Sequence, residues 1–154
     1  MPPGELTGMS NKYGSHELTQ QGLRWLKSQR QNLIELYQNA LPSIPFYRQV
    51  EVNARNEFAT RSIDRIIKRL EGSGFNTADL KDSLFVVLEQ SPGLQPMLDA
   101  SDKLEEIITI QVRQQLNEQA QVAEILLKKV QYLNQLSKAT MASALIQFES
   151  NKNH

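Results

Sequence analysis

The chain has 154 residues, and its 17 basic and 17 acidic side chains give no net charge. Without a global positive field it lacks the attraction that draws proteins to nucleic acid or anionic membranes, so neither is expected as a partner. It contains no cysteine, which excludes disulfides, a thiolate nucleophile and cysteine-ligated iron–sulfur clusters. No signal sequence or long apolar run is visible, so we expect a single-domain protein of the cytoplasm.

The N-terminal part of the chain predicts a disordered segment followed by a helix. Residues 1–15 hold several glycines and prolines and few apolar side chains, and we expect this segment to be disordered. A single helical domain is expected over residues 16–150. Its first helix begins near Ser15 or His16, carries Trp25 on its apolar face and ends before Pro42.

The middle of the chain predicts two further helices. Apolar residues recur at helical spacing from about Val52 to Leu70, and Gly72 supplies a C-terminal stop signal. A shorter helix is expected over residues 77–91, before the turn that contains Pro96. No alternating pattern long enough for a β-strand is present, so the predicted fold class is all-α: a helical bundle, either globin-like or of four or five helices, with a long C-terminal helix.

The last third of the chain contains neither glycine nor proline from Met97 onward. Because these residues are the strongest helix breakers, their absence predicts a long terminal helix over about residues 101–148. Residues 113–121 form a mainly polar stretch within it. We favour a continuous helix that protrudes from the domain, and we keep as the alternative a chain that folds back near residues 117–121.

The second half of this helix carries more apolar surface than a protruding helix can leave in water. Its apolar and small residues follow a spacing close to that of a coiled-coil seam. A second copy of the chain is the commonest way to cover such a surface, so we expect a homodimer. The predicted dimer interface consists of Val122, Leu126, Val130, Leu133, Ser137, Thr140 and Ala144.

A basic run on the second helix is the one charged feature that could recruit a protein partner. It consists of Arg61, Arg65, Lys68 and Arg69. A solvated helix face is the favoured interpretation, because charge runs on helices are mostly solubilising.

Aromatic residues in the first half of the chain could line a small pocket. The candidates are Trp25, Tyr37, Phe46 and Tyr47. A packed core is the favoured interpretation, because aromatic stripes at helical spacing usually fill volume. The two histidines, His16 and His154, lie in segments that we expect to be mobile. We therefore assign no catalytic residue, metal ligand or cofactor.

The order of these parts resembles the globin-like N-terminal domains of bacterial stressosome and related sigma-factor regulators. The resemblance spans about residues 23–136 and depends on Trp25, Pro45, Tyr47, Arg48 and the helix order. It implies a domain that binds no haem, dimerises and passes a signal along its terminal helix. The chain departs from that pattern by ending soon after this helix, with no output domain.

These observations predict a non-catalytic signalling or regulatory domain that acts by dimerisation and by contact with a protein partner. The alternative is a helical sensor module that binds a small ligand among the aromatic residues. An enzyme is the third possibility, although the sequence contains no recognisable nucleophile, base or metal-binding set.

Overall fold

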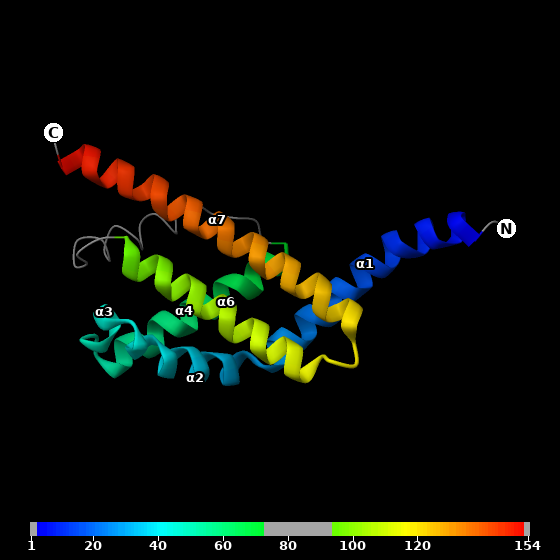
Figure 1. Cartoon of the computed structure of the whole chain (residues 1–154), viewed down its shortest axis with the longest axis horizontal. Coiled ribbons are helices and arrows are strands. Elements are labelled where there is room, and N and C mark those ends of the chain that lie inside the picture. The colour runs from blue at the N-terminus through cyan, green and yellow to red at the C-terminus, as the bar shows by residue number, and fades with distance from the viewer. Residues whose placement is uncertain (1–2, 73–93, 153–154) are drawn as a thin grey trace.

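A computed structural model describes residues 3–72 and 94–152, and every regular element within these residues is a helix (Figure 1). The elements are α1 (Pro3–Ser28), α2 (Arg30–Ala40), the short 3-10 helix η1 (Leu41–Ser43), α3 (Pro45–Arg48), α4 (Val52–Leu70), α6 (Gln95–Gln115) and α7 (Ala120–Lys152). The predicted all-α fold with a long C-terminal helix is confirmed. The helix predicted over residues 77–91 lies outside the described residues.

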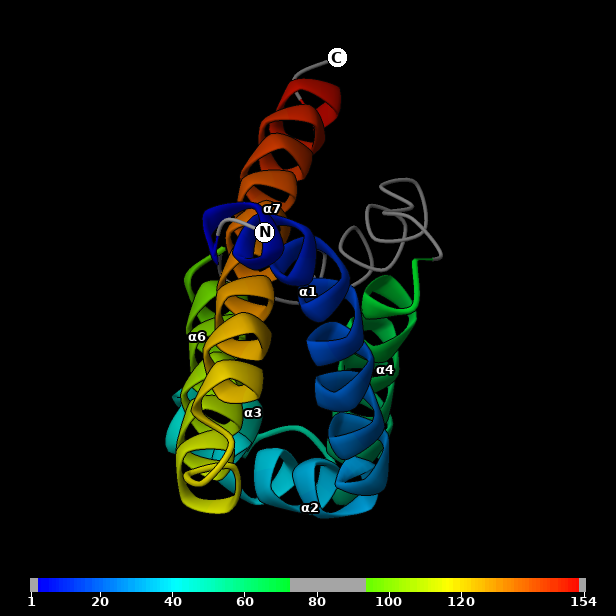
Figure 2. The same ribbon diagram turned by 90° about the vertical axis from the view of Figure 1, so that its right-hand side faces the viewer.

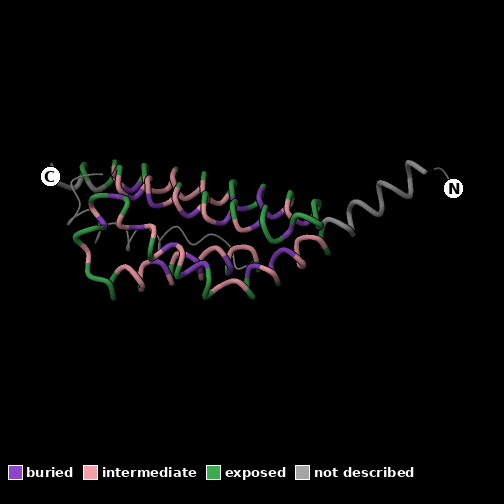
Figure 3. Tube along the Cα trace, turned by 60° about the horizontal axis from the view of Figure 1, so that its bottom comes forward, coloured by how far each residue is buried: buried purple, intermediate pink, exposed green. Residues whose placement is uncertain are grey.

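The helices form a bundle in which α6 and α7 lie together on one side, with α1 and α4 on the other (Figure 2). Helix α2 runs along the side of the bundle opposite α7 (Figure 1) and packs on both α4 and α6, while α7 packs on α6 and α1. Buried residues lie on the inward faces of these helices (Figure 3). The largest fully buried side chains are Leu26, Leu33, Ile34, Tyr37, Leu41, Ile63, Ile108 and Val112.

The N-terminal region differs from its predicted boundaries. Helix α1 begins at Pro3, within the segment predicted to be disordered, and its first turns extend away from the other helices (Figure 1). The helix expected to run unbroken to Pro42 is divided at Gln29. There the Ser28 hydroxyl donates a hydrogen bond to the carbonyl oxygen of Trp25, at 2.6 Å. Serine side chains that bond to the backbone in this way compete with helix continuation.

The glutamine at this division also ties the bend to the end of α6. The Trp25 indole Nε1 donates to Gln115 Oε1 at 3.2 Å, and Gln115 Nε2 donates to Gln29 Oε1 at 3.3 Å. The bend at Gln29 and the chain reversal after Gln115 therefore lie side by side. A single straight helix through Gln29 would carry α2 away from α4 and α6, on which it packs.

Helix α4 matches its prediction closely, because local signals set both of its ends. It runs from Val52 to Leu70, and Gly72 has a φ of 93°. Only glycine adopts that left-handed conformation without a steric cost, so Gly72 ends the helix as predicted.

The prediction of one continuous helix over residues 101–148 is wrong, and the folded-back alternative is right. Helix α6 begins at Gln95, with Pro96 in its first turn, and ends at Gln115. The chain then reverses over residues 116–119, and α7 returns along α6 (Figure 1). Pro96 therefore belongs to the helix and not to a turn before it, which agrees with the tolerance of proline for a first helical turn.

The reversal needs neither glycine nor proline, because its residues keep ordinary negative φ values. Leu116 leaves the helical region with φ −109° and ψ 23°, and its side chain is only 4% exposed. The Gln119 N–H donates to the Leu116 carbonyl oxygen at 2.9 Å and closes the turn. Folding back lets Val112 and Val122 bury their side chains in one core, which a protruding helix could not do.

The crossing of α1 and α7 depends on the small size of Gly22. A Cβ built at this position would lie 3.3 Å from the Cβ of Leu126. We expect Gly22→Leu to lower the free energy of unfolding by about 1–3 kcal/mol, as overpacked cores do. Chemical denaturation measures this change. Gly22→Ala is the matched control, since its gain in helix propensity offsets the tight contact. A fully stable leucine variant would contradict this close crossing.

Candidate functional site

The residues predicted to form a dimer interface face the interior of their own chain. Val122, Leu126 and Val130 are at most 3% exposed and belong to the same core as α1 and α6. Further along α7, Ser137 Oγ accepts a hydrogen bond from Arg69 Nη1 of α4, at 3.0 Å. In this fold Val122, Leu126 and Val130 are therefore not available for a contact between copies. The folded-back chain covers these three residues, and sequence periodicity alone could not distinguish this cover from a second molecule.

The remaining members of the predicted interface also lie on this inward side of α7. Leu133 and Thr140 are half-buried, and Ala144 is fully buried. The Thr140 hydroxyl is bonded to the carbonyl oxygen of Leu136 within the helix, at 2.9 Å.

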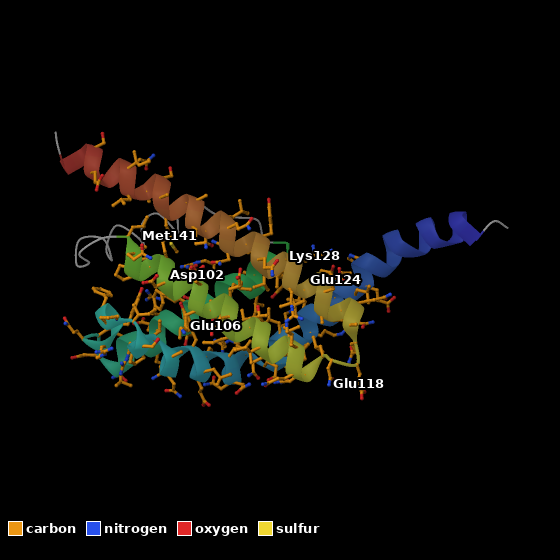
Figure 4. The ribbon with its side chains drawn as sticks, in the orientation of Figure 1. Asp102, Glu106, Glu118, Glu124, Lys128 and Met141 are labelled. Atoms are coloured by element: carbon orange, nitrogen blue, oxygen red, sulfur yellow. The ribbon has the colours of Figure 1, made fainter. Side chains whose placement is uncertain are left out.

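Polar contacts between α6 and α7 fix which side of α7 faces the bundle. Lys138 Nζ lies 2.8 Å from Asp102 Oδ1, and this carboxylate raises the pKa of the lysine. Asn134 Nδ2 donates to Asp102 Oδ1 at 3.3 Å and to Glu105 Oε1 at 3.1 Å. Asp102 lies on α6 below the middle of α7 (Figure 4). These contacts hold α7 against rotation about its own axis.

The opposite side of α7 is exposed and forms the candidate site. We define the outer face of α7 as six exposed residues. They are Tyr132, Gln135, Ala139, Ala142, Ser143 and Ile146. Tyr132 is 61% exposed and Ile146 is 68% exposed, which places both among the large apolar side chains left in water. Tyr132, Ala139 and Ile146 are spaced by seven residues, so they lie in one line along the helix.

Sequence reasoning missed this face, although a signal for it exists. The seven-residue spacing from Tyr132 to Ile146 is visible in the sequence. The wider stripe on the opposite side contains more leucine and valine, so the sequence favours that stripe as the dimer interface. The chain reversal after Gln115 determines which of the two sides of α7 stays exposed.

The basic run on α4 does not form one exposed patch. Arg61 and Lys68 are exposed, whereas Arg65 and Arg69 are half-buried. Arg61 Nη2 lies 2.8 Å from Glu57 Oε1 on the same helix. Arg69 reaches across to α7, and burial, followed by the nearby charge of Arg65, lowers its pKa to about 10. Residues of this run thus make separate local contacts. The interpretation as a solvated helix face applies only to the exposed residues Arg61 and Lys68.

An ion pair beside this run joins α2 to α4. Arg30 Nε donates to Asp64 Oδ1 at 2.6 Å and Arg30 Nη2 donates to Asp64 Oδ2 at 2.9 Å. The hydrogen bond from Arg30 is the main reason why the pKa of Asp64 is lowered from its ordinary value of 3.8. Both side chains are about 40% exposed, so solvent screening keeps the contribution small.

We expect Asp64→Asn to lower the free energy of unfolding by at most about 1 kcal/mol at neutral pH. Because the folded-state pKa of Asp64 is depressed, the stabilisation is present above 3.8 and is lost as the pH falls through the lower folded value. Urea titrations at several pH values should therefore show the two proteins converging in acid. Glu57→Gln, which removes a more exposed ion pair, is the control. If the difference in free energy of unfolding between the natural chain and Asp64→Asn grew in acid, this assignment would be contradicted.

Three of the four candidate pocket aromatics come together, and they do so as packed rings. The ring of Phe46 meets Tyr47 edge-on at 5.1 Å, and Tyr47 and Tyr37 lie 5.3 Å and 6.0 Å from Phe58. Trp25 lies apart, on α1, where it bonds to Gln115. The Tyr37 hydroxyl donates to the Ala100 carbonyl oxygen at 2.9 Å, and burial raises the pKa of Tyr37 well above its ordinary value.

One polar group in this aromatic cluster stands out. The hydroxyl of Tyr47 is buried and has no hydrogen-bond partner among the residues that the structure describes. Burial, with a smaller effect from the charge of Asp99, raises its pKa, so the phenol is neutral at physiological pH. A buried hydroxyl of this kind is a donor and acceptor that a small polar molecule could use.

Within the described residues, no three His, Cys, Asp or Glu side chains are placed to hold a metal ion. Nor does any helix in the described ranges combine the length and the apolar character needed to cross a membrane.

Comparisons with known proteins provide no family for the chain. No family model matches it, and neither does any curated protein or solved structure. Function must therefore be inferred from the surface and interior of the chain itself.

Proposed function

We propose that this chain is a non-catalytic regulatory domain of the cytoplasm, which acts by dimerisation and by contact with a protein partner. One observation carries the proposal: the outer face of α7 exposes Tyr132 and Ile146 on a helix held firmly against the bundle. Large apolar side chains on a rigid helix provide contact area at a low cost in conformational entropy. The resemblance to globin-like regulator domains is part of this proposal, and it suggests a signalling role.

The charge on α7 supports an interaction role. From residue 130 to residue 148 the only charged side chain is Lys138, and it is directed to Asp102 of the same chain. The solvent side of a helix in a monomeric protein normally carries charged residues. The lack of charged residues on the solvent side of this stretch favours a surface that another molecule covers when the protein is active.

Light scattering on the purified chain tests the proposal. We expect a dimer at tens of micromolar protein, with a mass that falls towards the monomer on dilution. A strict monomer throughout this range would overturn the dimeric part of the proposal. The measurement should be repeated at high salt, where an interface made mainly of apolar contacts persists.

A small-ligand sensor is the second candidate function, and the buried Tyr47 hydroxyl favours it. Thermal-shift measurement against a library of small polar metabolites tests it. A ligand at about 100 times its dissociation constant should stabilise the protein by about 2.7 kcal/mol. A thermal shift that Tyr47→Phe abolishes would support this function. The absence of a shift with every compound would contradict it.

A further inference from the structure

We propose that two copies of the chain associate through the outer face of α7, with the two α7 helices antiparallel and a two-fold axis beside Ala139. This inference rests on the proposed function and specifies its dimer contact. It places the contact on the side of α7 opposite to Val122, Leu126 and Val130, which the bundle covers.

The geometry of the outer face is self-complementary in this arrangement. Tyr132 and Ile146 are equally distant from Ala139 along the helix. When two α7 helices run antiparallel about Ala139, Tyr132 of each copy therefore lies opposite Ile146 of the other. The small side chains of Ala139 and Ala142 lie between these pairs and allow the helices to approach closely. Each large exposed side chain thus meets a counterpart, as a two-fold interface requires.

Charge decides between the antiparallel and the parallel arrangement. Lys128 lies at one end of the face and Glu149 at the other, and both are exposed. A parallel pair would bring each of these residues against its own copy, which is a like-charge contact. The antiparallel pair brings Lys128 of one copy near Glu149 of the other. Lys128 forms a solvent-exposed ion pair with Glu124 of its own chain, at 3.0 Å, and it can exchange this partner at little cost.

No helix that the structure describes covers this face, whose residues are all exposed. Lys128 and Glu124 are seen on α7 away from the core (Figure 4), and α2 lies at the opposite side of the bundle from α7 (Figure 1). The contact from Lys128 to Ser150 would extend over about 33 Å at about 1.5 Å per residue. That length is comparable to the helix contacts of stable two-stranded assemblies, which use several heptads.

Disulfide cross-linking tests the register directly, because the natural chain contains no cysteine. Two cysteines can join only when their Cα atoms lie within about 4.4–6.8 Å. We expect Ala139→Cys to form a covalent dimer on mild oxidation. Tyr132→Cys and Ile146→Cys should each remain uncross-linked alone, whereas an equimolar mixture of the two should give the mixed dimer. Gln31→Cys, an exposed position on α2, is the matched control.

The possible outcomes separate this inference from the proposed function. Self-cross-linking of Tyr132→Cys and of Ile146→Cys, without the mixed product, would show a parallel pair and overturn the antiparallel register. Cross-linking of Ala139→Cys no greater than that of Gln31→Cys would overturn the contact itself. If the natural chain still scatters as a dimer in that case, the proposed function stands and only this face is wrong. A strict monomer overturns both this inference and the dimeric part of the proposed function.

A charge placed in the face provides a second test without oxidation. We expect Ala139→Glu to weaken dimerisation at least tenfold, since the two carboxylates would meet at the axis, while the thermal melt of the monomer stays unchanged. Gln31→Glu is the control. An unchanged dissociation constant for Ala139→Glu would overturn the inference.

Discussion

Leu126→Glu is expected to lower the free energy of unfolding by about 4–5 kcal/mol, the largest effect that we predict for a single substitution. Leu126 is 3% exposed, and its side chain packs against the backbone of Gly22 in α1. The introduced carboxyl would lie in an apolar core that offers it no partner. Urea denaturation followed by circular dichroism at neutral pH measures the loss. A domain of ordinary stability would be close to unfolded.

The pH dependence of this variant identifies the cause of the loss. Burial raises the folded-state pKa of the introduced carboxyl above its unfolded value, so the penalty should shrink as the pH falls through that raised pKa. The natural chain, measured at each pH, corrects for other titrating groups. Ile146→Glu is the matched control on the same helix, because Ile146 is 68% exposed. At dilutions where the chain is monomeric, it should leave the melt intact. A Leu126→Glu protein with full stability and a lost dimer would restore the originally predicted interface.

The contrast between Leu126 and Ile146 shows where sequence reasoning succeeds on α7 and where it fails. Apolar spacing correctly indicates that Leu126 and its neighbours are covered. It does not indicate what covers them, because a helix of the same chain and a helix of another molecule present the same chemistry. The choice depends on the direction of the chain after Gln115, which is a property of tertiary packing.

Local signals explain why other elements could be predicted. Helix α4 ends where expected because Gly72 supplies a conformation that other residues avoid. The reversal at Leu116 carries no such signal, since its φ of −109° is open to any residue. The reversal is stabilised by the burial of Leu116 and of the apolar faces of α6 and α7, which lie on either side of it. Similarly, no local signal identifies the partner of Asp102, which binds Lys138 on the neighbouring helix α7.

Lys129→Pro is expected to lower the free energy of unfolding by about 3 kcal/mol or more, the second largest effect that we predict. Lys129 is exposed, so the substitution removes no core contact. Its cost arises in the backbone of α7, where proline eliminates one helical hydrogen bond and collides with the preceding turn. Because α7 packs on both α1 and α6, breaking it should weaken the whole bundle. Lys129→Ala is the control, and chemical denaturation is the measurement.

Gln119→Pro distinguishes the folded-back chain from a continuous helix. In one long helix, proline at Gln119 and at Lys129 would cost about the same, since both would interrupt helix interior. In the observed fold Gln119 precedes α7, and its N–H makes one turn hydrogen bond, to Leu116. Losing that bond should cost only about 1 kcal/mol. The ratio of the two losses is therefore the informative quantity, and equal losses would show that the chain does not reverse at Leu116.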